Sequence, residues 1–368
     1  MSVESLRASR PRVREAGIAL PGDHVPGAVN AITDVPDVRV GHVTCWEGEG
    51  ASALRTGVTA ILPHGGNLFR EKVTAAVHTI NGFGKPTGWP QVAELGVLET
   101  PIVLTNTLSV GEAFTGVVRH ALAENPDIGG IAGTVNPLVA ECNDGDLSAI
   151  RRLAVTSDDV LRAIQDAQTG AVAEGAVGAG TGMTCYGWKG GIGTASRIVE
   201  LPEGRFTIGA LVLANYGRPD DLTVAGSRVG DKLPRPNGLP PGSEVGGSIV
   251  CVVATDLPFD GRQLGRLARR AQNGIARTGG DCEHGSGEFV IAFSTAHGRA
   301  DAPVLPADGP ELMNPCFRAV ASAVEESILN ALFTAVTVTG VDGRVVSALP
   351  TELVVQLAGR ADPGTDGA

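Results

Sequence analysis

The chain has 368 residues, of which 43% are apolar and 19% charged, so it is long and apolar enough to bury a sizeable core. The 51 glycines and 23 prolines make up about one fifth of it, a share below that of disordered sequences. Forty acidic against 29 basic residues give a net charge of −11, which repels phosphate backbones. These values exclude a fibrous protein, a disordered chain and a coiled coil, and they argue against a nucleic-acid partner.

Cysteines and histidines give no sign of a metal or a cofactor. The six cysteines are scattered without a CxxC pair, which is typical of reduced thiols in a cytoplasmic protein. The histidines are dispersed, and His42, His64 and His78 lack metal-ligand spacing. No run of about 18 apolar residues occurs, and the first residues lack the apolar stretch of a secretory signal. We therefore expect a cytoplasmic protein with no membrane partner.

Short β-rich runs alternate along the chain with fewer, longer helical stretches. The pattern predicts strands over residues 32–44, 56–63, 101–107, 205–215, 248–255, 288–295 and 335–340. It predicts helices over residues 109–125, 157–170, 260–275 and 314–335, the second capped by Ser157 and the last opened by Asn314 and Pro315. Several strands are apolar on both faces, which is typical of strands covered on both sides. Sheets that enclose helices, and helices that enclose sheets, are both compatible with this order.

Two glycine-rich segments interrupt the pattern. Residues 230–247 contain four prolines, five glycines and no periodic apolar face, which predicts an exposed loop. Residues 176–194 invite comparison with a nucleotide-binding loop, but Met183 stands at the third glycine position of GxGxxG, and the following residues do not continue a helix. The second segment therefore predicts a sharply turning stretch where backbones approach closely.

Gly247 and Ser248 stand where this loop meets the most apolar strand of the chain. From spacing alone they are an ordinary turn before a strand. A serine hydroxyl can also attack the carbonyl of the residue before it, and glycine there lets the peptide twist toward the reactive geometry. The new N-terminal serine would carry an amine with a reference pKa of about 7.7–8.0. Such an amine can serve as the base for its own hydroxyl.

Ser286 and Glu288 are two residues apart at the start of a predicted strand, so their side chains share one face. A hydroxyl and a carboxylate on one face could form a relay that orients a nucleophile. They could equally cap a strand end at the surface, and the spacing does not separate the two interpretations.

Motifs along nearly the whole chain carry a family resemblance. GGSIVCVVATD and SGEFVIAFSTA, with NAITDVPDVRVGH, RTGVTAILPHG, TNTLSVGEAF, GAGTGMTCYGWKGGIGTASR and ANYG, occur in the order typical of one family over roughly residues 10–335. The sequence resembles the L-aminopeptidase/D-Ala-esterase/amidase family, which includes the β-peptidyl aminopeptidases and is related to the nylon-oligomer hydrolases. The resemblance implies an α+β protein built as a four-layer β/α/α/β sandwich, similar to N-terminal-nucleophile hydrolases.

The resemblance also implies a mechanism and its residues. A single integrated domain, residues 1–368, would cleave itself between Gly247 and Ser248 into a large chain, 1–247, and a small chain, 248–368. Ser248 would then form the acyl-enzyme. Further roles follow by motif match: Ser286 and Glu288 orient Ser248, Asn215 supports the oxyanion, and Glu141 holds the substrate's ammonium group. Many relatives carry a tyrosine where this chain has Asn143, and often another aromatic residue at Asp146, so we expect Asn143 to contact substrate with altered selectivity.

The sequence thus predicts a self-processing serine aminopeptidase or amidase for small peptides, amides or esters with a free amine, and the family resemblance implies a homotetramer. One alternative keeps the chemistry but takes linear amides such as aminohexanoate oligomers. The other is an unprocessed, non-catalytic protein that binds an amine-bearing metabolite.

Overall fold

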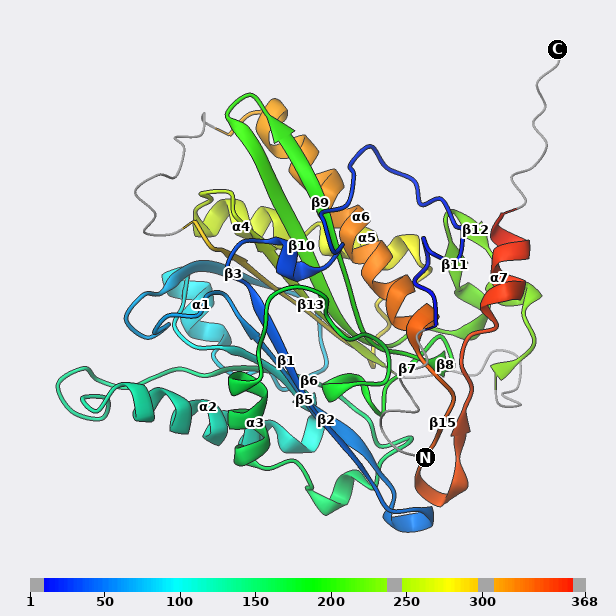
Figure 1. The fold of residues 1–368 in the computed structure, drawn as a ribbon, viewed down its shortest axis with the longest axis horizontal. Coiled ribbons are helices and arrows are strands. Elements are labelled where there is room, and N and C mark those ends of the chain that lie inside the picture. The colour runs from blue at the N-terminus through cyan, green and yellow to red at the C-terminus, as the bar shows by residue number, and fades with distance from the viewer. Residues whose placement is uncertain (1–9, 237–246, 297–307, 360–368) are drawn as a thin grey trace.

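Two sheets form the centre of the molecule (Figure 1). The computed structural model describes residues 10–236, 247–296 and 308–359. The four-stranded sheet has the order β1 (Arg39–Glu47), β2 (Leu54–Leu62), β5 (Ile102–Asn106) and β6 (Leu138–Cys142). The six-stranded sheet has the order β4 (Val97–Leu98), β3 (Val73–Gly82), β14 (Gly287–Ser294), β13 (Ser248–Thr255), β10 (Gly204–Asn215) and β9 (Gly191–Leu201).

Helices and short hairpins complete the described residues. The helices are α1 (Trp89–Leu95), α2 (Val110–Glu124), α3 (Ser157–Gln165), α4 (Gly261–Ala268), α5 (Ala271–Arg277), α6 (Pro310–Thr334) and α7 (Thr351–Ala358). Three two-stranded units pair β7 (Thr184–Cys185) with β8 (Trp188–Lys189), β11 (Thr223–Val224) with β12 (Ser227–Arg228), and β15 (Val338–Thr339) with β16 (Val345–Val346). None of the helices in these residues is both long and apolar enough to cross a membrane.

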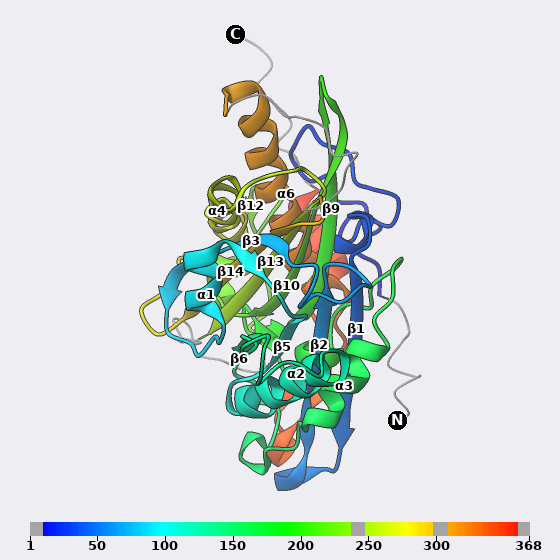
Figure 2. The same ribbon diagram turned by 90° about the vertical axis from the view of Figure 1, so that its left-hand side faces the viewer.

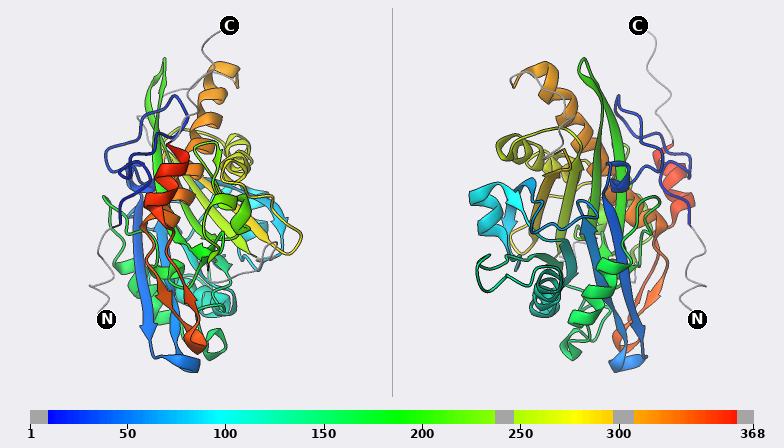
Figure 3. Two further views of the ribbon diagram at one scale, coloured as in Figure 1. Left: turned by 90° about the vertical axis from the view of Figure 1, so that its right-hand side faces the viewer. Right: turned by 60° about the vertical axis from the view of Figure 1, so that its left-hand side comes forward.

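The sheets face each other, and the helices cover their outer faces (Figures 2 and 3). Along β13, Val250 and Val252 pack into the core between the sheets, while Cys251 and Val253 pack into the core under the helices. Because side chains alternate across a strand, each strand of this kind must be covered on both sides. The four-layer sandwich is confirmed, but its expected layer order is wrong: the layers run helix, sheet, sheet, helix.

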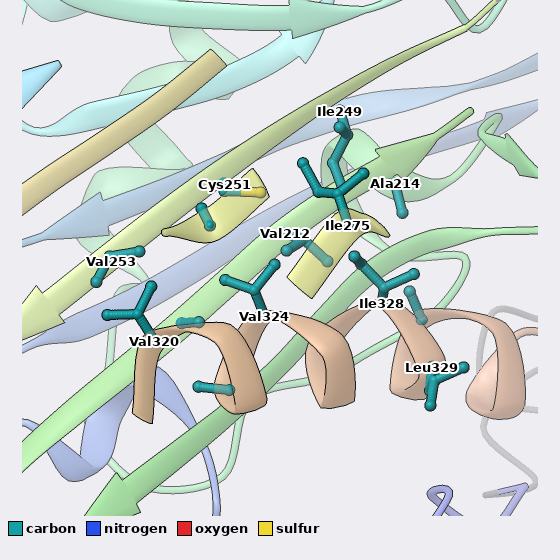
Figure 4. Packing of buried hydrophobic residues seen from close by; sticks show 14 of the residues in the cluster. Val212, Ala214, Ile249, Cys251, Val253, Ile275, Val320, Val324, Ile328 and Leu329 are labelled. Atoms are coloured by element: carbon teal, nitrogen blue, oxygen red, sulfur yellow. The ribbon is translucent and has the colours of Figure 1, made fainter. Parts of the chain in front are cut away.

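One helical layer rests on the six-stranded sheet. Helix α6 lies along β9 and β10, and α5 packs beside it. Val320, Val324 and Ile328 of α6 meet the outward-facing side chains of β10 and β13, which include Val212 and Cys251 (Figure 4). Each such side chain contributes roughly 1.5–3 kcal/mol when fully buried. The other helical layer, α2 and α3, covers β1, β2, β5 and β6.

Most predicted elements are present, with shifted ends. The strand expected from residue 32 begins at Arg39, because Pro36 lacks an N–H and Asp37 adopts a positive φ of 71°. The helix expected over 260–275 is divided into α4 and α5. Thr156, not Ser157, caps α3 by accepting the Asp159 N–H. The last long helix begins at Pro310, so Asn314 and Pro315 lie inside it.

The two glycine-rich segments are described to different extents. Of the predicted loop at 230–247, residues 237–246 lie outside the described part of the chain. The segment 176–194 does turn sharply and approach other backbone, as expected. A Cβ on Gly193 would lie 1.9 Å from the Ser327 carbonyl oxygen of α6, so only glycine allows β9 to contact the helix this closely.

Candidate active site

Ser248 begins β13, between two other strands of the six-stranded sheet. It lies opposite Asn215 of the antiparallel β10 and opposite Gly287 of the parallel β14. Its relative exposure is only 8%. The abrupt change from glycine-rich loop to apolar strand therefore places a hydroxyl at the end of a rigid sheet, where neighbouring strands fix its surroundings.

Gly247, the residue before it, is held tightly. Its carbonyl oxygen accepts a hydrogen bond from the Gly287 N–H at 3.1 Å. A Cβ at this position would lie 2.5 Å from both the Asn215 carbonyl oxygen and the Tyr216 Cα. Because backbone atoms cannot move aside cheaply, the site requires glycine. The Gly287 N–H polarises the carbonyl that precedes Ser248, as an oxyanion-hole donor would.

The Ser248 side chain belongs to the face of β13 that looks toward the other sheet. Val250 and Val252 share this face and pack into the core between the sheets. There the Ser248 hydroxyl lies near the Cys142 thiol at the end of β6, and this thiol donates to the Leu213 carbonyl oxygen at 3.6 Å. Burial raises the pKa of that thiol well above its ordinary value, the Glu141 charge adds to the shift, and the nearby Ser248 hydroxyl opposes it only partly. Cys142 is therefore a neutral neighbour of the hydroxyl, one that the sequence did not indicate.

Ser286 and Glu288 lie on the other side of the same strands. Glu288 shares the helix-facing side of β14 with Val290 and Ala292, and it is fully buried. Burial raises the pKa of its carboxyl group, the Glu283 charge adds to the shift, and the nearby Ser286 hydroxyl opposes it. Neither carboxylate oxygen makes a hydrogen bond of ordinary geometry with a described residue. Ser286 and Glu288 therefore lie beside each other, as their spacing predicted, and the carboxylate keeps spare hydrogen-bonding capacity.

A cavity of about 180 Å³ opens beside this pair. It brings Gly247, Ser286 and Glu288 together, although they come from different parts of the chain. The cavity is lined by Tyr216, Gly217, Arg218, Asp221, Gly247, Gly279, Asp281, Cys282, Glu283, Gly285, Ser286 and Glu288. The two faces of the strands therefore carry different functional groups at this end. One face has the Ser248 hydroxyl and the Asn215 amide, and the other has the Ser286 hydroxyl and the Glu288 carboxylate.

The Asn215 amide is fixed at both of its ends. Its Oδ1 accepts the Thr184 N–H at 2.8 Å, and its Nδ2 donates to the Asn143 carbonyl oxygen at 3.1 Å. Nδ2 carries two hydrogens, so one N–H remains for another acceptor. Because Asn215 is directly opposite Ser248, a fixed donor lies next to the hydroxyl.

Asn143 contributes through its main chain. Its side chain is exposed, and the Oδ1 accepts the Gly145 N–H at 2.9 Å in a local turn. Asp146 is exposed as well and pairs with Arg344 at 2.6 Å. The described contact of Asn143 with the site is its carbonyl oxygen, which holds Asn215. This role was not predicted from its side chain.

Glu141 lies directly before Cys142 on β6 and is buried, with a relative exposure of 4%. Its Oε1 accepts the Lys85 N–H at 3.0 Å, and its Oε2 accepts a hydrogen bond from the Thr107 hydroxyl. Two fixed donors keep the carboxylate in one orientation. A buried, oriented carboxylate at the end of β6 has the chemistry to bind an ammonium group.

Among the residues that the structure describes, no group of three or more His, Cys, Asp and Glu side chains is placed to hold a metal ion. The groups with evident chemistry are hydroxyls, carboxylates, an amide and main-chain N–H donors. Such groups support nucleophilic attack on a carbonyl and stabilisation of the resulting oxyanion.

Known proteins share this arrangement of elements. The β-peptidyl aminopeptidase BapA of Sphingosinicella microcystinivorans is 41% identical over 93% of this chain and 90% of that protein. The crystal structure of the PH0078 protein from Pyrococcus horikoshii OT3 matches with a TM-score of 0.87 at 48% identity, over 94% of this chain and 98% of that one.

A second solved structure links the fold to a named class. The L-aminopeptidase D-Ala-esterase/amidase from Ochrobactrum anthropi, described as a prototype of serine aminopeptidases and a variant of the Ntn-hydrolase fold, matches with a TM-score of 0.84 at 40% identity, over 95% of this chain and 99% of that one. The model of peptidase family S58 matches residues 30–346. The chain belongs to peptidase family S58 and is a hydrolase of the aminopeptidase and amidase type.

Proposed function

We propose that the chain first cleaves itself at Gly247–Ser248 and then acts as an N-terminal serine aminopeptidase or amidase. The observation that carries this proposal is that Gly247 is held in a fixed position. Its carbonyl oxygen accepts a hydrogen bond from the Gly287 N–H, and its Cα lies against Asn215 and Tyr216 with no room for a side chain. A peptide held this way next to a buried serine has its carbonyl polarised and its neighbour positioned for attack.

Self-cleavage is an acyl shift followed by hydrolysis. The Ser248 Oγ attacks the Gly247 carbonyl carbon, the C–N bond breaks, and the Ser248 nitrogen takes up the proton that the hydroxyl releases. Water then splits the resulting ester, leaving a carboxylate on Gly247 and a free α-amine and hydroxyl on Ser248. The products are a large chain, residues 1–247, and a small chain, residues 248–368. The cavity that contains Gly247, Ser286 and Glu288 supports a role for this pair in the proton transfer.

Turnover uses the same serine with its new amine. The α-amine takes the proton from Oγ as the oxygen attacks the substrate carbonyl, and returns it to the leaving amine when the acyl-enzyme forms. The free N–H of Asn215 stabilises the oxyanion on the face that carries the hydroxyl. Ser286 and Glu288, on the opposite face, orient the α-amine. Glu141 binds the substrate's ammonium group with a carboxylate held by Lys85 and Thr107.

We propose small peptides, amides or esters with a free N-terminal amine as substrates. The names of the relatives, β-peptidyl aminopeptidase and L-aminopeptidase D-Ala-esterase/amidase, support this class. Side-by-side assays of L-aminoacyl anilides, D-Ala amides, β-peptides and aminohexanoate oligomers separate it from the linear-amide alternative. Hydrolysis of the oligomers alone would overturn the proposed class.

Mass spectrometry of the purified protein tests self-cleavage directly. The wild type is expected as two chains, the smaller beginning at Ser248, and Ser248→Ala as one intact inactive chain. Ser248→Cys is the matched control, because it keeps a nucleophile at the same atom and should still cleave itself, at a different rate. An active wild type with an unbroken chain would refute the mechanism. An intact wild type that binds amines without hydrolysing amides would instead support the non-catalytic alternative.

Two further proposals concern the setting of the enzyme. The six free cysteines support a cytoplasmic location, where thiols stay reduced. A homotetramer of processed chains is proposed from the family resemblance, and native mass spectrometry measures it. Cell fractionation tests the location, and a protein recovered outside the cytoplasm would contradict it.

A further inference from the structure

A lysine ammonium group is buried in the glycine-rich segment beside the site. Lys189 of β8 has no exposed surface, and its Nζ donates to the carbonyl oxygens of Gly180, Met183 and Gly190 at 2.9, 2.8 and 2.8 Å. All three of its N–H groups are therefore used. Burial lowers the pKa of Lys189 to about 7, while the charge of Asp144 opposes the shift.

Asp144 is the acidic counterpart of this lysine. It is completely buried, and neither of its carboxylate oxygens makes a hydrogen bond of ordinary geometry with a described residue. Burial raises the pKa of Asp144 to about 7, with the Thr56 hydroxyl and the Lys189 charge favouring the ionised form. Gly182 lies against it, since a Cβ there would be 2.7 Å from the Asp144 Cβ. A buried acid and a buried base thus lie close enough to influence each other electrostatically, without forming an ion pair in the described residues.

Both residues connect to Asn215 through single peptide groups. The Met183 carbonyl that Lys189 holds and the Thr184 N–H that Asn215 Oδ1 accepts belong to one peptide unit. On the other side, the Asn143 carbonyl that accepts from Asn215 Nδ2 belongs to the peptide that leads into Asp144. The peptide group that holds Asn215 Oδ1 is therefore fixed by the Lys189 ammonium group, and the peptide group that holds Nδ2 leads directly into the buried Asp144.

The hairpin that carries this contact is itself rigid. Thr184 and Lys189 are direct partners in the β7–β8 pair. Tyr186 and Gly187 in the turn have positive φ values of 51° and 74°, as a tight two-residue turn requires. The Tyr186 hydroxyl is fixed by Thr278 at 3.0 Å. Movement of Lys189 would thus be transmitted to the Thr184 N–H instead of being absorbed by a flexible loop.

We propose that Lys189 and Asp144 are positioning residues that set the plane of the Asn215 amide, so that its free N–H points at the oxyanion formed on Ser248. This inference rests on the proposed function, which makes Asn215 an oxyanion donor. A buried pair that only stabilised the fold would affect the amount of folded protein and its melting temperature. A positioning pair affects the transition state as well, and does so only while Asn215 is present.

A double-mutant cycle on processed, active-site-titrated enzyme separates the two roles. Lys189→Met keeps the length of the side chain and removes the charge. We expect it to lower kcat about tenfold or more, with a much smaller change in KM. In an Asn215→Ala background the same substitution should produce no further loss of kcat. Equal losses in both backgrounds would overturn the inference.

Controls keep the test decisive. Glu326→Gln breaks a fully buried ion pair with Arg197, away from the site, and should lower the melting temperature while leaving kcat unchanged. If Lys189→Met does not fold, the same cycle is run with Asp144→Asn, which keeps the shape of the side chain.

Crystal structures of the Lys189→Met and Asp144→Asn variants report on Asn215 without any activity. A displaced or rotated Asn215 amide is expected, and an unchanged amide would overturn the inference. A wild type without amidase activity would overturn the proposed function instead, and the structures would still decide whether the pair orients Asn215.

Discussion

Ser248 and Asn215 lie directly opposite each other on β13 and β10, with both side chains on the face that looks toward the four-stranded sheet. Directly opposed residues of an antiparallel pair have Cβ atoms about 4.5–5.5 Å apart. The relation between nucleophile and amide donor is therefore set by strand register, not by a loop. A slip of one residue would place the two side chains on opposite faces.

Removal of the Asn215 amide should reduce turnover strongly. Asn215→Ala is expected to lower kcat by about 10²–10³-fold, the range for loss of one oxyanion-hole donor. Steady-state kinetics on processed enzyme measure it. Asn67→Ala, which removes an amide that hydrogen-bonds with Asn125 and the Arg70 N–H, is the control and should leave kcat unchanged. A similar fall in both variants would remove Asn215 from the mechanism.

Loss of the Glu288 charge should slow the reaction more than it weakens binding. Glu288→Gln keeps size and hydrogen-bonding atoms but cannot hold the ammonium form of the Ser248 amine. We expect a large fall in kcat with little change in KM. Glu283→Gln removes a charge in the same cavity that pairs with Arg218 and raises the pKa of Glu288, so it should move the acid limb of the pH profile to lower pH. Unchanged turnover in Glu288→Gln would exclude it from the relay.

Glu141 should matter only for substrates with a free amine. Glu141→Gln is expected to raise KM for L-aminoacyl amides, because the neutral amide attracts an ammonium group less than a carboxylate does. The matched control is the same substrate with its amine acetylated, which both enzymes should hydrolyse equally poorly. A variant that discriminates between the free and the acetylated substrate as well as the wild type does would contradict the assignment.

Two glycine substitutions should have opposite effects on stability. Gly193→Ala places a Cβ 1.9 Å from the Ser327 carbonyl oxygen and pushes α6 from β9, so the free energy of unfolding should fall by about 1–3 kcal/mol or more. Gly111→Ala, on the exposed side of α2 with open space around it, should raise it by about 0.5–1 kcal/mol. Chemical denaturation of both variants measures the change in the free energy of unfolding. A gain in stability for both variants would show that α6 can move aside to accommodate the added Cβ.

The pH dependence of stability should contain a term from Glu174. Burial raises the pKa of this carboxyl from 4.5 to about 7, although Arg12 pairs with it at 2.8 Å. Since the folded state holds the proton more tightly, this stability is present below pH 4.5 and is lost as the pH rises to 7, by about 3 kcal/mol. Melting curves between pH 4.5 and 8 should show the wild type losing stability relative to Glu174→Gln. The exposed Glu203→Gln should give no such trend.

The apolar pattern predicted the strands that carry the site, because β10, β13 and β14 are apolar on both faces. Strands β3, β6 and β9 were not predicted. In β9 the cause is physical, because Gly191 and Gly193 weaken its strand pattern. Gly191 is required by a close approach of the Gly175 and Gly180 backbone, and Gly193 by the contact with α6, which comes from distant sequence. The layer order was wrong because a two-sided apolar strand does not specify which face meets a helix.

The residues with predicted roles lie near one another at one end of the sheets, but their division between two faces was not predicted. Alternation along β14 does place Ser286 and Glu288 together, as spacing alone suggested. The contributions of Cys142, Thr184 and Gly287 depend on strand pairing and on main-chain groups, which a single sequence does not reveal. A lysine inside an otherwise uncharged glycine-rich segment was the one available signal for the buried pair of Lys189 with Asp144.

The order of the six-stranded sheet has a consequence for the mature enzyme. Strands β13 and β14 would belong to the small chain, yet their outer neighbours β10 and β3 would belong to the large one. Scission next to Ser248 would therefore leave the fragments interlocked by main-chain ladders on both flanks, and neither could depart without tearing the sheet. Cleavage would free the Ser248 amine without loosening the six-stranded sheet that positions it.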